Sequence, residues 1–416
     1  MQKLEVFGAN QLKGQIKISG SKNASLPILA ATILSNKKII LKNLPKVRDI
    51  ETMLLLLKSL GSKIILNRKT TIIDNSNQNK KFASYNLVKT MRAGILVLGP
   101  LLAKHKKAKV SLPGGCAIGT RPIDIHLKAL SKLGVKYKID QGYVIANAPK
   151  GLKGNKIKFP KISVGATENL IIAACFAKGT TTLSNCAIEP EIIDLISFLK
   201  KMGGKIKISG RKIIINESNV LNEQINHQII FDRIEAGTYL VAGALIGRKL
   251  IIKNVETKIF KSEIKILKKM GVKIKANKKT ISIFKSKNLK KIIISTKPFP
   301  GFPTDLQAQL MVLMTQAKGL SKIKENIFEN RFMHVPELRR MGAKIEIKNK
   351  TALIFGPTKL TGAEVMATDL RASVSLVLAG LAAEKRTIVN RIYHLDRGYE
   401  SLEEKLKNCK AEIKRV

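Results

Sequence analysis

The sequence predicts an α/β protein made of six similar repeats, grouped into two halves of three repeats each. Three observations lead to this fold class: the length of the chain, a short motif that recurs six times, and an apolar segment upstream of each copy. With 416 residues the chain is too long for one ordinary hydrophobic core, and two domains of about 200 residues each fit its length.

The recurring motif has the pattern of a surface helix that ends at a glycine and is followed by a strand. A leucine begins each copy, and the glycine position comes four residues later. Glycine there predicts a left-handed helix end, because it adopts positive φ without steric cost. Successive copies lie 68 to 73 residues apart, and their turn positions are occupied by Gly61, Gly134, Gly203, Gly271, Gly342 and, in the sixth copy, Lys410.

An alanine- and leucine-rich segment precedes each copy and predicts a helix that is apolar on most of its faces. Such a helix belongs inside a domain, so each repeat is expected to contain a buried helix, strands and a surface helix. The six predicted buried helices cover residues 26–34, 93–103, 169–177, 236–246, 305–317 and 372–383.

Three repeats can place their buried helices at the centre of a domain with the strands outside. Two such domains would leave a cleft between them, and clefts between domains are common ligand sites. A repeat scaffold without enzymatic function is the alternative, and the unusual loops between the repeats argue against it.

The net charge of the chain is +47, from 76 Lys and Arg against 29 Asp and Glu. A nucleic-acid-binding protein and an enzyme with anionic substrates are two interpretations of this charge. The lysines are spread along the chain, and aromatic residues, which could stack on bases, make up 5% of it. This distribution favours an enzyme with small anionic substrates and no nucleic-acid partner.

Cysteine spacing and hydropathy narrow the class of protein further. Cys116, Cys175, Cys186 and Cys409 have neither zinc-like nor redox-like spacing, so neither a metal site nor a disulfide framework is expected. Cys175 and Cys186 lie in apolar stretches and are predicted to be buried. The chain opens without a signal-peptide pattern and has no apolar run of membrane-spanning length. We therefore expect a soluble, cytoplasmic protein without membrane insertion.

Two loops in the N-terminal half suggest chemistry. Residues 20–27 place Lys22 and Asn23 at the start of a buried helix, where a cation adds to free N–H groups and the helix dipole in binding an anion. A turn with a surface lysine is the simpler interpretation. Residues 112–124 surround Cys116 with three glycines and two prolines, which predicts a mobile loop. Positive charge at Arg121 would favour the Cys116 thiolate and suit it as an acid or nucleophile, the alternative being an idle thiol.

Carboxylates open two buried helices in the C-terminal half. Asp305 stands at the start of the fifth, where it is either an N-cap or a group that accepts the proton of a substrate hydroxyl. Asp369 opens the sixth.

Several cations stand at loop ends, where each alone could be a surface charge or half of a salt bridge. Together they predict a site for a polyanion that carries carboxylate and phosphate groups. These cations are Lys22, Arg92, Arg121, Arg371 and Arg397.

Six motifs occur in the same order as in one known family. They read Gly-Ser-Lys-Asn at 20–23, Leu-Pro-Gly-Gly-Cys-x-Ile-Gly-x-Arg-Pro at 112–122, Gly-Phe-Pro-Thr-Asp at 301–305, Glu-Asn-Arg-Phe-Met-His at 329–334, Asp-Leu-Arg-Ala-Ser at 369–373 and Asp-Arg-Gly-Tyr-Glu at 396–400. In these motifs the chain resembles the UDP-N-acetylglucosamine 1-carboxyvinyltransferases, from the first strand to the C-terminus.

The resemblance implies two domains of inside-out α/β barrel type. The N-terminal three-repeat domain would cover residues 22–230, and residues 1–21 would join residues 231–416 in the C-terminal one. The chain would cross between the domains twice, with the active site in the cleft.

The resemblance also implies roles for individual residues. The catalytic group would consist of Cys116, Asp305, Lys22, Arg121, Arg397, Asp369 and Arg371. Lys22, Arg121 and Arg397 would hold phosphoenolpyruvate. The substrate-binding set would further include Asn23, Arg92, Pro122, Ile123, Asp124, Ile125, His126, Lys161, Ser163, Val164, Gly165, Asp305, Ile327 and Arg331.

The implied reaction moves the enolpyruvyl group of phosphoenolpyruvate to the 3-hydroxyl of UDP-N-acetylglucosamine, the first committed step of peptidoglycan precursor synthesis. Carbon 3 is protonated, and the hydroxyl adds at carbon 2 while Asp305 takes its proton. The tetrahedral intermediate then loses phosphate and a carbon-3 proton, which restores the double bond. Cys116 would donate a proton and be the target of the antibiotic fosfomycin. The resemblance implies no cofactor and no metal.

Two other functions are the alternatives. The sister enzyme that acts on shikimate 3-phosphate would share the architecture, but it would not need the Cys116 loop or the nucleotide segment 121–125. Its usual Ser-Lys-Ser motif is also Ser-Lys-Asn in this chain. A basic nucleic-acid-binding protein would gather its charge on one face, whereas the lysines of this chain are evenly spread.

Overall fold

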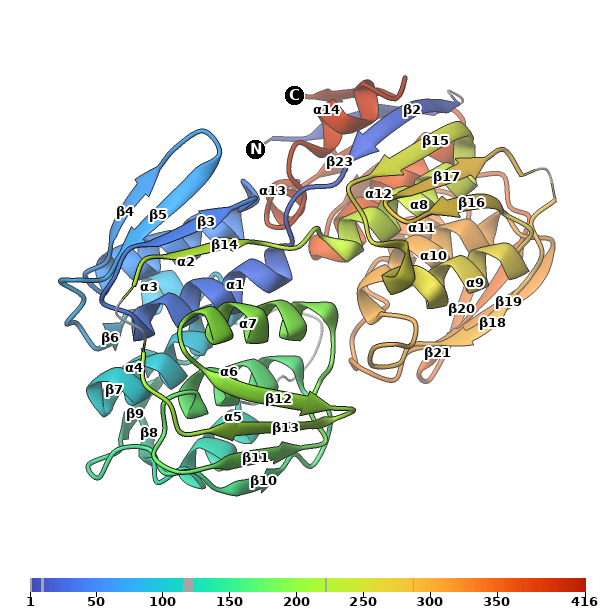
Figure 1. The fold of residues 1–416 in the computed structure, drawn as a ribbon. Coiled ribbons are helices and arrows are strands. Elements are labelled where there is room, and N and C mark those ends of the chain that lie inside the picture. The colour runs from blue at the N-terminus through green and yellow to red at the C-terminus, as the bar shows by residue number, and fades with distance from the viewer. Residues whose placement is uncertain (1, 9–10, 115–122, 221–222, 287) are drawn as a thin grey trace. The chain divides into compact units, whose positions relative to one another are not determined.

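The computed structural model describes residues 2–8, 11–114, 123–220, 223–286 and 288–416. Contacts divide these residues into two compact units (Figure 1). The N-terminal unit comprises the described residues of 20–230, and the C-terminal unit comprises those of 1–19 and 231–416. Each unit has a hydrophobic core of its own.

The described residues form six four-stranded sheets, three in each unit, and all six share one pattern of strand directions. In each sheet one edge strand runs parallel to its neighbour, and the other neighbouring strands are antiparallel. This repetition confirms the prediction of six repeats in an α/β fold.

In the N-terminal unit each sheet begins, in spatial order, with its parallel edge strand. The first sheet is β14 (Ile225–Gln228), β3 (Ile39–Lys42), β5 (Thr70–Asp74) and β4 (Lys63–Leu66). The second is β6 (Phe82–Ala83), β7 (Lys107–Ser111), β9 (Tyr143–Asn147) and β8 (Lys136–Asp140). The third is β10 (Lys156–Lys158), β11 (Thr181–Ser184), β13 (Lys212–Asn216) and β12 (Lys205–Ser209).

The C-terminal unit repeats this arrangement. Its first sheet is β2 (Leu12–Lys17), β15 (Gly247–Lys253), β17 (Thr280–Phe284) and β16 (Lys273–Asn277). Its second is β18 (Ile293–Ser295), β19 (Gly319–Lys324), β21 (Thr351–Gly356) and β20 (Lys344–Lys348). Its third is β22 (Glu364–Met366), β23 (Arg386–Asn390), β1 (Leu4–Phe7) and β24 (Glu412–Arg415).

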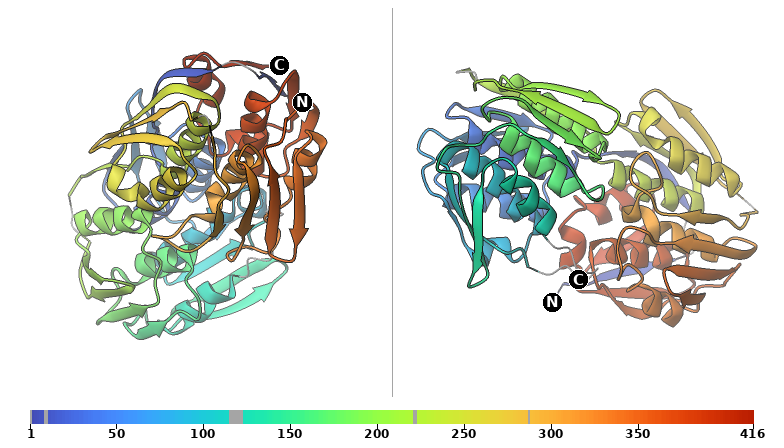
Figure 2. Two further views of the ribbon diagram at one scale, coloured as in Figure 1. Left: turned by 90° about the vertical axis from the view of Figure 1, so that its right-hand side faces the viewer. Right: turned by 90° about the horizontal axis from the view of Figure 1, so that it is seen from below.

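Apolar helices fill the inside of each unit, and the strands lie outside them (Figures 1 and 2). All nine residues of one of these helices, α10, are buried. A helix with no polar face must be enclosed on all sides, and each large aliphatic side chain that it buries contributes about 1.5–3 kcal/mol. The inner helices are α1 (Lys22–Ala31), α4 (Leu98–His105) and α6 (Val164–Ala174) in one unit, and α8 (Arg233–Ile246), α10 (Gln307–Thr315) and α12 (Leu370–Ala382) in the other.

A second set of helices is amphipathic and lies on the surface. Most of them have an acidic residue in the first turn and lysines or arginines in the last turn, which complements the helix dipole. They are α2 (Arg48–Ser59), α5 (Asp124–Ser131), α7 (Pro190–Lys201), α9 (Lys261–Lys269), α11 (Val335–Arg340) and α14 (Leu402–Lys407). Short connecting turns are α3 (Tyr85–Val88), α13 (Tyr393–Asp396), η1 (Thr32–Leu34), η2 (Arg92–Val97), η3 (Thr257–Phe260) and η4 (Thr304–Leu306).

The residue that follows each surface helix adopts the left-handed conformation that the repeat motif predicts. The five motif glycines have φ between +89° and +106°, and Lys410 has φ +73°. The sixth repeat therefore keeps the turn of the other five with a residue that has a Cβ atom. A β-carbon makes this conformation unfavourable by about 1–2 kcal/mol.

Four inner helices begin earlier than the sequence predicts. Helix α1 starts four residues before residue 26, α6 five before residue 169, α8 three before residue 236 and α12 two before residue 372. The predictions followed the apolar runs, whereas the true starts are set by side-chain caps. Ser21, Ser163 and Asp232 each accept hydrogen bonds from backbone N–H groups of the first turn.

The N-terminal strand β1 completes the sixth repeat. It takes the position between β23 and β24 and pairs antiparallel with both. In the other five sheets this position is occupied by the second strand of the hairpin that follows the surface helix. The backbone groups of Lys3 and Val416 exchange hydrogen bonds of 2.8 and 3.0 Å, so the two ends of the chain adjoin in one sheet.

Candidate functional site

The site residues predicted from the sequence fall into two sets, one in each unit. Cys116, Arg121 and Pro122 lie outside the described residues, so their placement stays a prediction. The remaining residues can be followed element by element.

Lys22 is the first residue of α1 and is almost enclosed. Its Nζ lies 2.7 Å from Oδ2 of Asp49, and the two side chains are 10% and 6% exposed. Asp49 lies in the first turn of α2, where a carboxylate also complements the helix dipole. The ion pair holds the lysine in place at the start of α1, beside the half-buried Asn23.

Arg92 and His126 act on one another electrostatically. Arg92 opens η2 and is half-buried, whereas His126 lies in α5 and is buried. Burial, with a further contribution from the charge of Arg92, lowers the pKa of His126 to about 4, and Asp124 opposes this shift. The imidazole is therefore neutral at neutral pH. Ile123 and Ile125 are buried on either side of the half-buried Asp124.

The start of α6 lies beside His126, although 37 or more residues separate these segments in the sequence. Ser163 caps the helix by accepting from the N–H of Ala166 at 3.3 Å. A side chain at Gly165 would lie 3.3 Å from Cε1 and 3.5 Å from Nε2 of His126, so glycine permits this close approach. Lys161 and Val164 are exposed.

In the C-terminal unit two arginines bind the carboxylate of Asp305. Arg331 donates from Nη2 to Oδ1 at 2.8 Å, and Arg371 donates from Nη2 to Oδ2 at 2.9 Å. Both guanidinium groups are nearly buried, while the Asp305 side chain is 25% exposed. The structure thus brings together three predicted residues around a carboxylate that remains accessible.

Asp369 sets the position of Arg371. As N-cap of α12, Asp369 accepts from the backbone N–H groups of Arg371 and Ala372 at 2.7 and 3.1 Å. Burial alone would lower the pKa of Arg371, but Asp305 raises it above its usual value, so the guanidinium stays charged. Asp369 is therefore a capping residue of the helix that presents Arg371.

A buried polar network that the sequence did not predict lies behind Asp305 and Arg371. Tyr399 accepts from Nη1 of Arg371 at 3.3 Å, and its hydroxyl lies 2.8 Å from Oγ1 of Thr238. Gln309 donates to Thr238, to Tyr399 and to the carbonyl oxygen of Asp305. A glutamine inside an otherwise apolar helix is the signal that could have revealed this network.

A buried glutamate links Ile327 to the loop of Asp305. Glu325 is 1% exposed and accepts from the N–H groups of Ile327 and Phe328 at 2.7 and 3.2 Å. Its other oxygen accepts from the hydroxyl of Thr304, the neighbour of Asp305, at 2.9 Å. No sequence motif had pointed to Glu325.

Arg397 lies at the end of α13 and is half-buried. Its charge acts on His394, whose pKa is lowered first by burial and then by Arg397, while Asp369 opposes the shift. Arg397 and Asp369 therefore act on the same imidazole.

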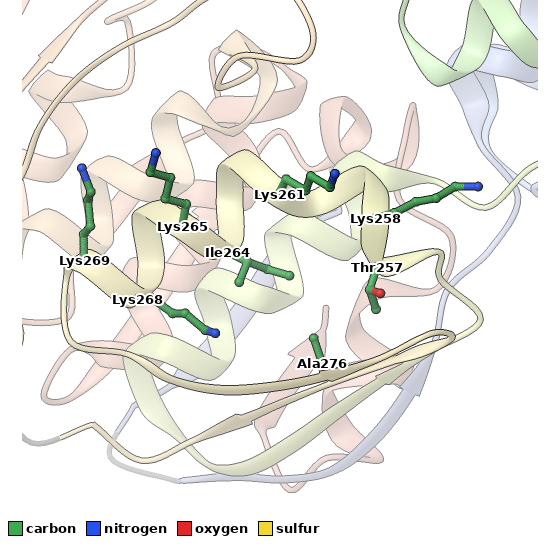
Figure 3. A pocket seen from close by; sticks show the side chains of 8 residues that line it. All are labelled: Thr257, Lys258, Lys261, Ile264, Lys265, Lys268, Lys269 and Ala276. Atoms are coloured by element: carbon green, nitrogen blue, oxygen red, sulfur yellow. The ribbon is translucent and has the colours of Figure 1, made fainter.

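A separate hollow of about 690 Å³ lies on the C-terminal unit, between α9 with its preceding turn and β16 (Figure 3). Figure 3 shows Ile264 and Ala276 facing each other, while Lys265 and Lys269 extend from the other side of α9. None of the predicted site residues lines this hollow.

Cys175 and Cys186 are fully buried, as predicted, and burial raises the pKa of each thiol to about 12. In the described ranges no three His, Cys, Asp or Glu side chains are grouped so that they could hold a metal ion. Nor is any helix within those ranges long and apolar enough to cross a membrane.

Comparisons with known proteins agree with this fold and arrangement. Residues 6–406 match the family model described as EPSP synthase (3-phosphoshikimate 1-carboxyvinyltransferase). The chain is 67% identical to a UDP-N-acetylglucosamine 1-carboxyvinyltransferase of Pelagibacter ubique and 51% identical to one of Nitratiruptor sp., and each match covers 100% of both chains.

Solved structures with lower identity share the fold. The crystal structure of the enolpyruvyl transferase NikO from Streptomyces tendae superposes with a TM-score of 0.90 at 23% identity, over 100% of this chain and 99% of that one. EPSP synthase from Acinetobacter baumannii superposes with a TM-score of 0.77 at 17% identity, over 100% of both chains. From the family match and the full-length identities together, the chain belongs to the EPSP synthase family of enolpyruvyl transferases, and within it to the UDP-N-acetylglucosamine 1-carboxyvinyltransferases.

Proposed function

We propose that this enzyme transfers the enolpyruvyl group of phosphoenolpyruvate to the 3-hydroxyl of UDP-N-acetylglucosamine and releases phosphate. Membership of the family supports the reaction type, and relatives that are named for this acceptor support the acceptor. Its place of action would be the cytoplasm, where nucleotide sugars and phosphoenolpyruvate are available.

The observation that carries the proposal is the environment of Asp305. Two cationic donors, Arg331 and Arg371, each take one carboxylate oxygen and fix the plane of the group. The side chain is 25% exposed, so a substrate hydroxyl can reach the carboxylate and donate to it. We assign to Asp305 the role of accepting the proton of the 3-hydroxyl as that oxygen adds to carbon 2.

The two arginines serve that step twice. They orient the carboxylate before the reaction, and their charges remain in place when Asp305 becomes neutral and the phosphate group gains charge. Because both guanidinium groups are nearly buried, little solvent has to reorganise around them during the reaction.

For the donor we propose that Lys22, Arg121 and Arg397 hold the carboxylate and phosphate of phosphoenolpyruvate. Lys22 is supported by its enclosed position at a helix start, where its side chain is 10% exposed. An anion there would meet the ammonium group and the N-terminal end of α1 together.

For the sugar nucleotide we propose two segments of the N-terminal unit and one loop of the C-terminal unit. Residues 123–126 and 163–165 approach each other at Gly165, and the start of α6 offers N–H groups to a phosphate. Residues of this proposed set with a described placement are Asn23, Arg92, Ile123, Asp124, Ile125, His126, Lys161, Ser163, Val164, Gly165 and Ile327.

Cys116 would supply the proton to carbon 3 and would be the residue that fosfomycin alkylates. This role comes from the match of the loop at 112–122 to the family motif. The reaction needs no oxidant, because the addition forms one C–O bond, the elimination breaks another, and the proton gained at carbon 3 is lost again.

The test is phosphate release from phosphoenolpyruvate by the purified enzyme with three acceptor conditions: UDP-N-acetylglucosamine, shikimate 3-phosphate and none. Release with the sugar nucleotide alone, and its loss after treatment with fosfomycin, is the expected result. Release with shikimate 3-phosphate instead would overturn the proposed acceptor.

The Asp305→Asn variant tests the assigned role at constant size. Losing the proton acceptor should lower kcat by about 10²–10⁴-fold. The matched control is Asp140→Asn, which changes an exposed carboxylate of β8 and should leave kcat unchanged. Equal kcat in Asp305→Asn and the unaltered enzyme would remove Asp305 from the mechanism.

A further inference from the structure

Asn169 lies fully buried in the inner helix α6, and both ends of its side-chain amide are fixed by backbone groups. The backbone N–H of Gly99 donates to Oδ1 at 2.9 Å, and Nδ2 donates to the carbonyl oxygen of Ile95 at 3.2 Å. Turning the amide over would place two donors together at Gly99 and two acceptors together at Ile95. The orientation of the amide is therefore determined.

The same Nδ2 atom lies 3.2 Å from Nδ1 of His126. An amide NH2 group only donates, so Nδ1 of His126 has to be the acceptor and carries no proton. A neutral imidazole has one N–H, which must then be on Nε2. The contact thus selects one of the two tautomers.

We propose that Asn169 is a positioning residue that holds His126 as the neutral tautomer with its proton on Nε2, so that the nucleotide site contains a permanent uncharged hydrogen-bond donor. This inference rests on the proposed function, because residues 163–165 are there assigned to the sugar nucleotide.

The direction of Nε2 supports this role. A Cβ added at Gly165 would lie 3.5 Å from Nε2 of the ring. Ser163 uses its side chain to cap α6. The N–H of His126 therefore lies beside the segment whose backbone is proposed to bind the nucleotide, and it suits an oxygen acceptor such as a phosphate, ribose or uracil oxygen.

The proposed role also requires that the imidazole of His126 be uncharged. Burial and the charge of Arg92 lower the pKa of His126 to about 4, whereas Asp124 acts in the opposite direction. A protonated ring would carry a proton on Nδ1 and point it at the NH2 group of Asn169, which cannot accept it. The donor on Nε2 is thus retained, without titration, over the pH range in which the enzyme would work.

The primary measurement is the tautomer itself, read from the chemical shifts of the imidazole nitrogens in the full-length protein labelled with ¹⁵N. The chain has five histidines, and the His126→Gln variant identifies the signals of His126. We expect an unprotonated Nδ1 and a protonated Nε2 throughout pH 6–8. A proton on Nδ1 in this range would overturn the inference, and this measurement needs no substrate.

The Asn169→Asp variant reverses the preference at nearly constant size. A carboxylate accepts from Nδ1–H, so the proton should move to Nδ1 and the pKa of His126 should rise. The KM for UDP-N-acetylglucosamine should increase about tenfold, as expected for one lost hydrogen bond, while kcat changes by less than about threefold.

The matched control is Asn75→Asp. Asn75 is also fully buried in the N-terminal unit and donates to the carbonyl oxygen of Thr32. The Asn75→Asp variant should be less stable than the unaltered protein. Its His126 nitrogen signals and its KM for UDP-N-acetylglucosamine should be unchanged. If Asn169→Asp does not fold, Asn169→Ser removes the amide without adding charge and should yield a mixture of both tautomers.

Different results would contradict the assigned tautomer, the positioning role of Asn169 and the proposed function. An altered tautomer with unchanged KM would overturn the positioning role while the assignment of the tautomer stands. An enzyme that releases no phosphate with UDP-N-acetylglucosamine would overturn the proposed function, and the nitrogen shifts would still report whether Asn169 fixes the ring.

Discussion

Nη2 of Arg371 lies 2.9 Å from Oδ2 of Asp305, and the two residues are 66 positions apart in the chain. The guanidinium also donates through Nη1 to the Tyr399 hydroxyl. Arg371 is thereby fixed at two of its nitrogens, so the geometry of the accessible carboxylate depends on a phenol behind it.

Replacing Tyr399 with phenylalanine should lower kcat. The change removes an acceptor from Arg371 and a partner from Thr238 and Gln309, and one lost hydrogen bond to a charged group is worth about 1.5–3 kcal/mol. We expect kcat to fall by about tenfold or more, measured by phosphate release. Tyr85→Phe is the control, because Tyr85 is 55% exposed; equal losses in both variants would contradict the role of Tyr399.

Replacing Glu325 with glutamine should disturb the loop that carries Ile327. Oε1 of Glu325 accepts three hydrogen bonds, and Oε2 accepts one from Thr304. An amide NH2 in place of Oε1 would face the N–H groups of Ile327 and Phe328, and in place of Oε2 it would require the Thr304 hydroxyl to turn and accept. In either orientation the hydrogen bonds to a charged carboxylate are lost. The KM for UDP-N-acetylglucosamine should rise by about tenfold in steady-state assays. Glu346→Gln, an exposed change in β20, should leave KM unaltered.

The stability of the C-terminal unit should fall in mild acid because of His334. Burial lowers the pKa of His334 from an ordinary value of 6.5 to about 4. The charge of Asp369 opposes this shift, and the charge of Arg331 adds to it. Below pH 6.5 the unfolded chain binds a proton that the folded unit does not. The contribution of His334 to the unfolding free energy is therefore fully present above about pH 6.5. It is lost as the pH falls to about 4, which lowers the unfolding free energy by up to about 3 kcal/mol.

Urea unfolding at several pH values, followed by a probe in the C-terminal unit, measures this effect. The His334→Asn variant should show a shallower decline in unfolding free energy between pH 6.5 and 4. Parallel curves for the two proteins would show that His334 does not titrate as stated.

The Lys410→Gly variant should be more stable than the unaltered protein. Lys410 has φ +73°, a conformation that glycine adopts without a steric cost. Glycine removes this steric cost from the folded state but also gives the unfolded chain more conformational entropy. The first effect is larger, so the unfolding free energy should rise by about 0.5–1 kcal/mol. Glu404→Gly, an exposed change inside helix α14, should instead lower the melting temperature. A lower melting temperature for Lys410→Gly would contradict the explanation.

The sequence predicted the six repeats and the inner helices because both depend on local patterns. A glycine at a helix end and an apolar segment are visible in any single repeat. The starts of the helices were placed too late because Ser21, Ser163 and Asp232, which fix them by capping, are polar and precede the apolar runs.

The residues that support the site were not predictable in the same way. Asp305, Arg331 and Arg371 were found from motifs, but the partners behind them come from distant parts of the chain. Thr238 and Tyr399 are 161 residues apart, and Asn169 and His126 are 43 apart. Gln309 is recognisable in the sequence as a polar residue in a largely apolar helix, whereas Glu325 stands between Lys324 and Asn326 and carries no such signal. The hydrogen-bond partners of both become visible only in the folded structure.

The position of β1 also determines the order in which the protein can be completed on the ribosome. All strands of the N-terminal unit lie between residues 39 and 228, so this unit has every part it needs well before synthesis ends. Strands β1 and β2 are made first, but β1 pairs with β23 and β24, and β24 ends at Arg415. Strand β1 must therefore stay without one of its two neighbouring strands until residues 412–415 have been synthesised.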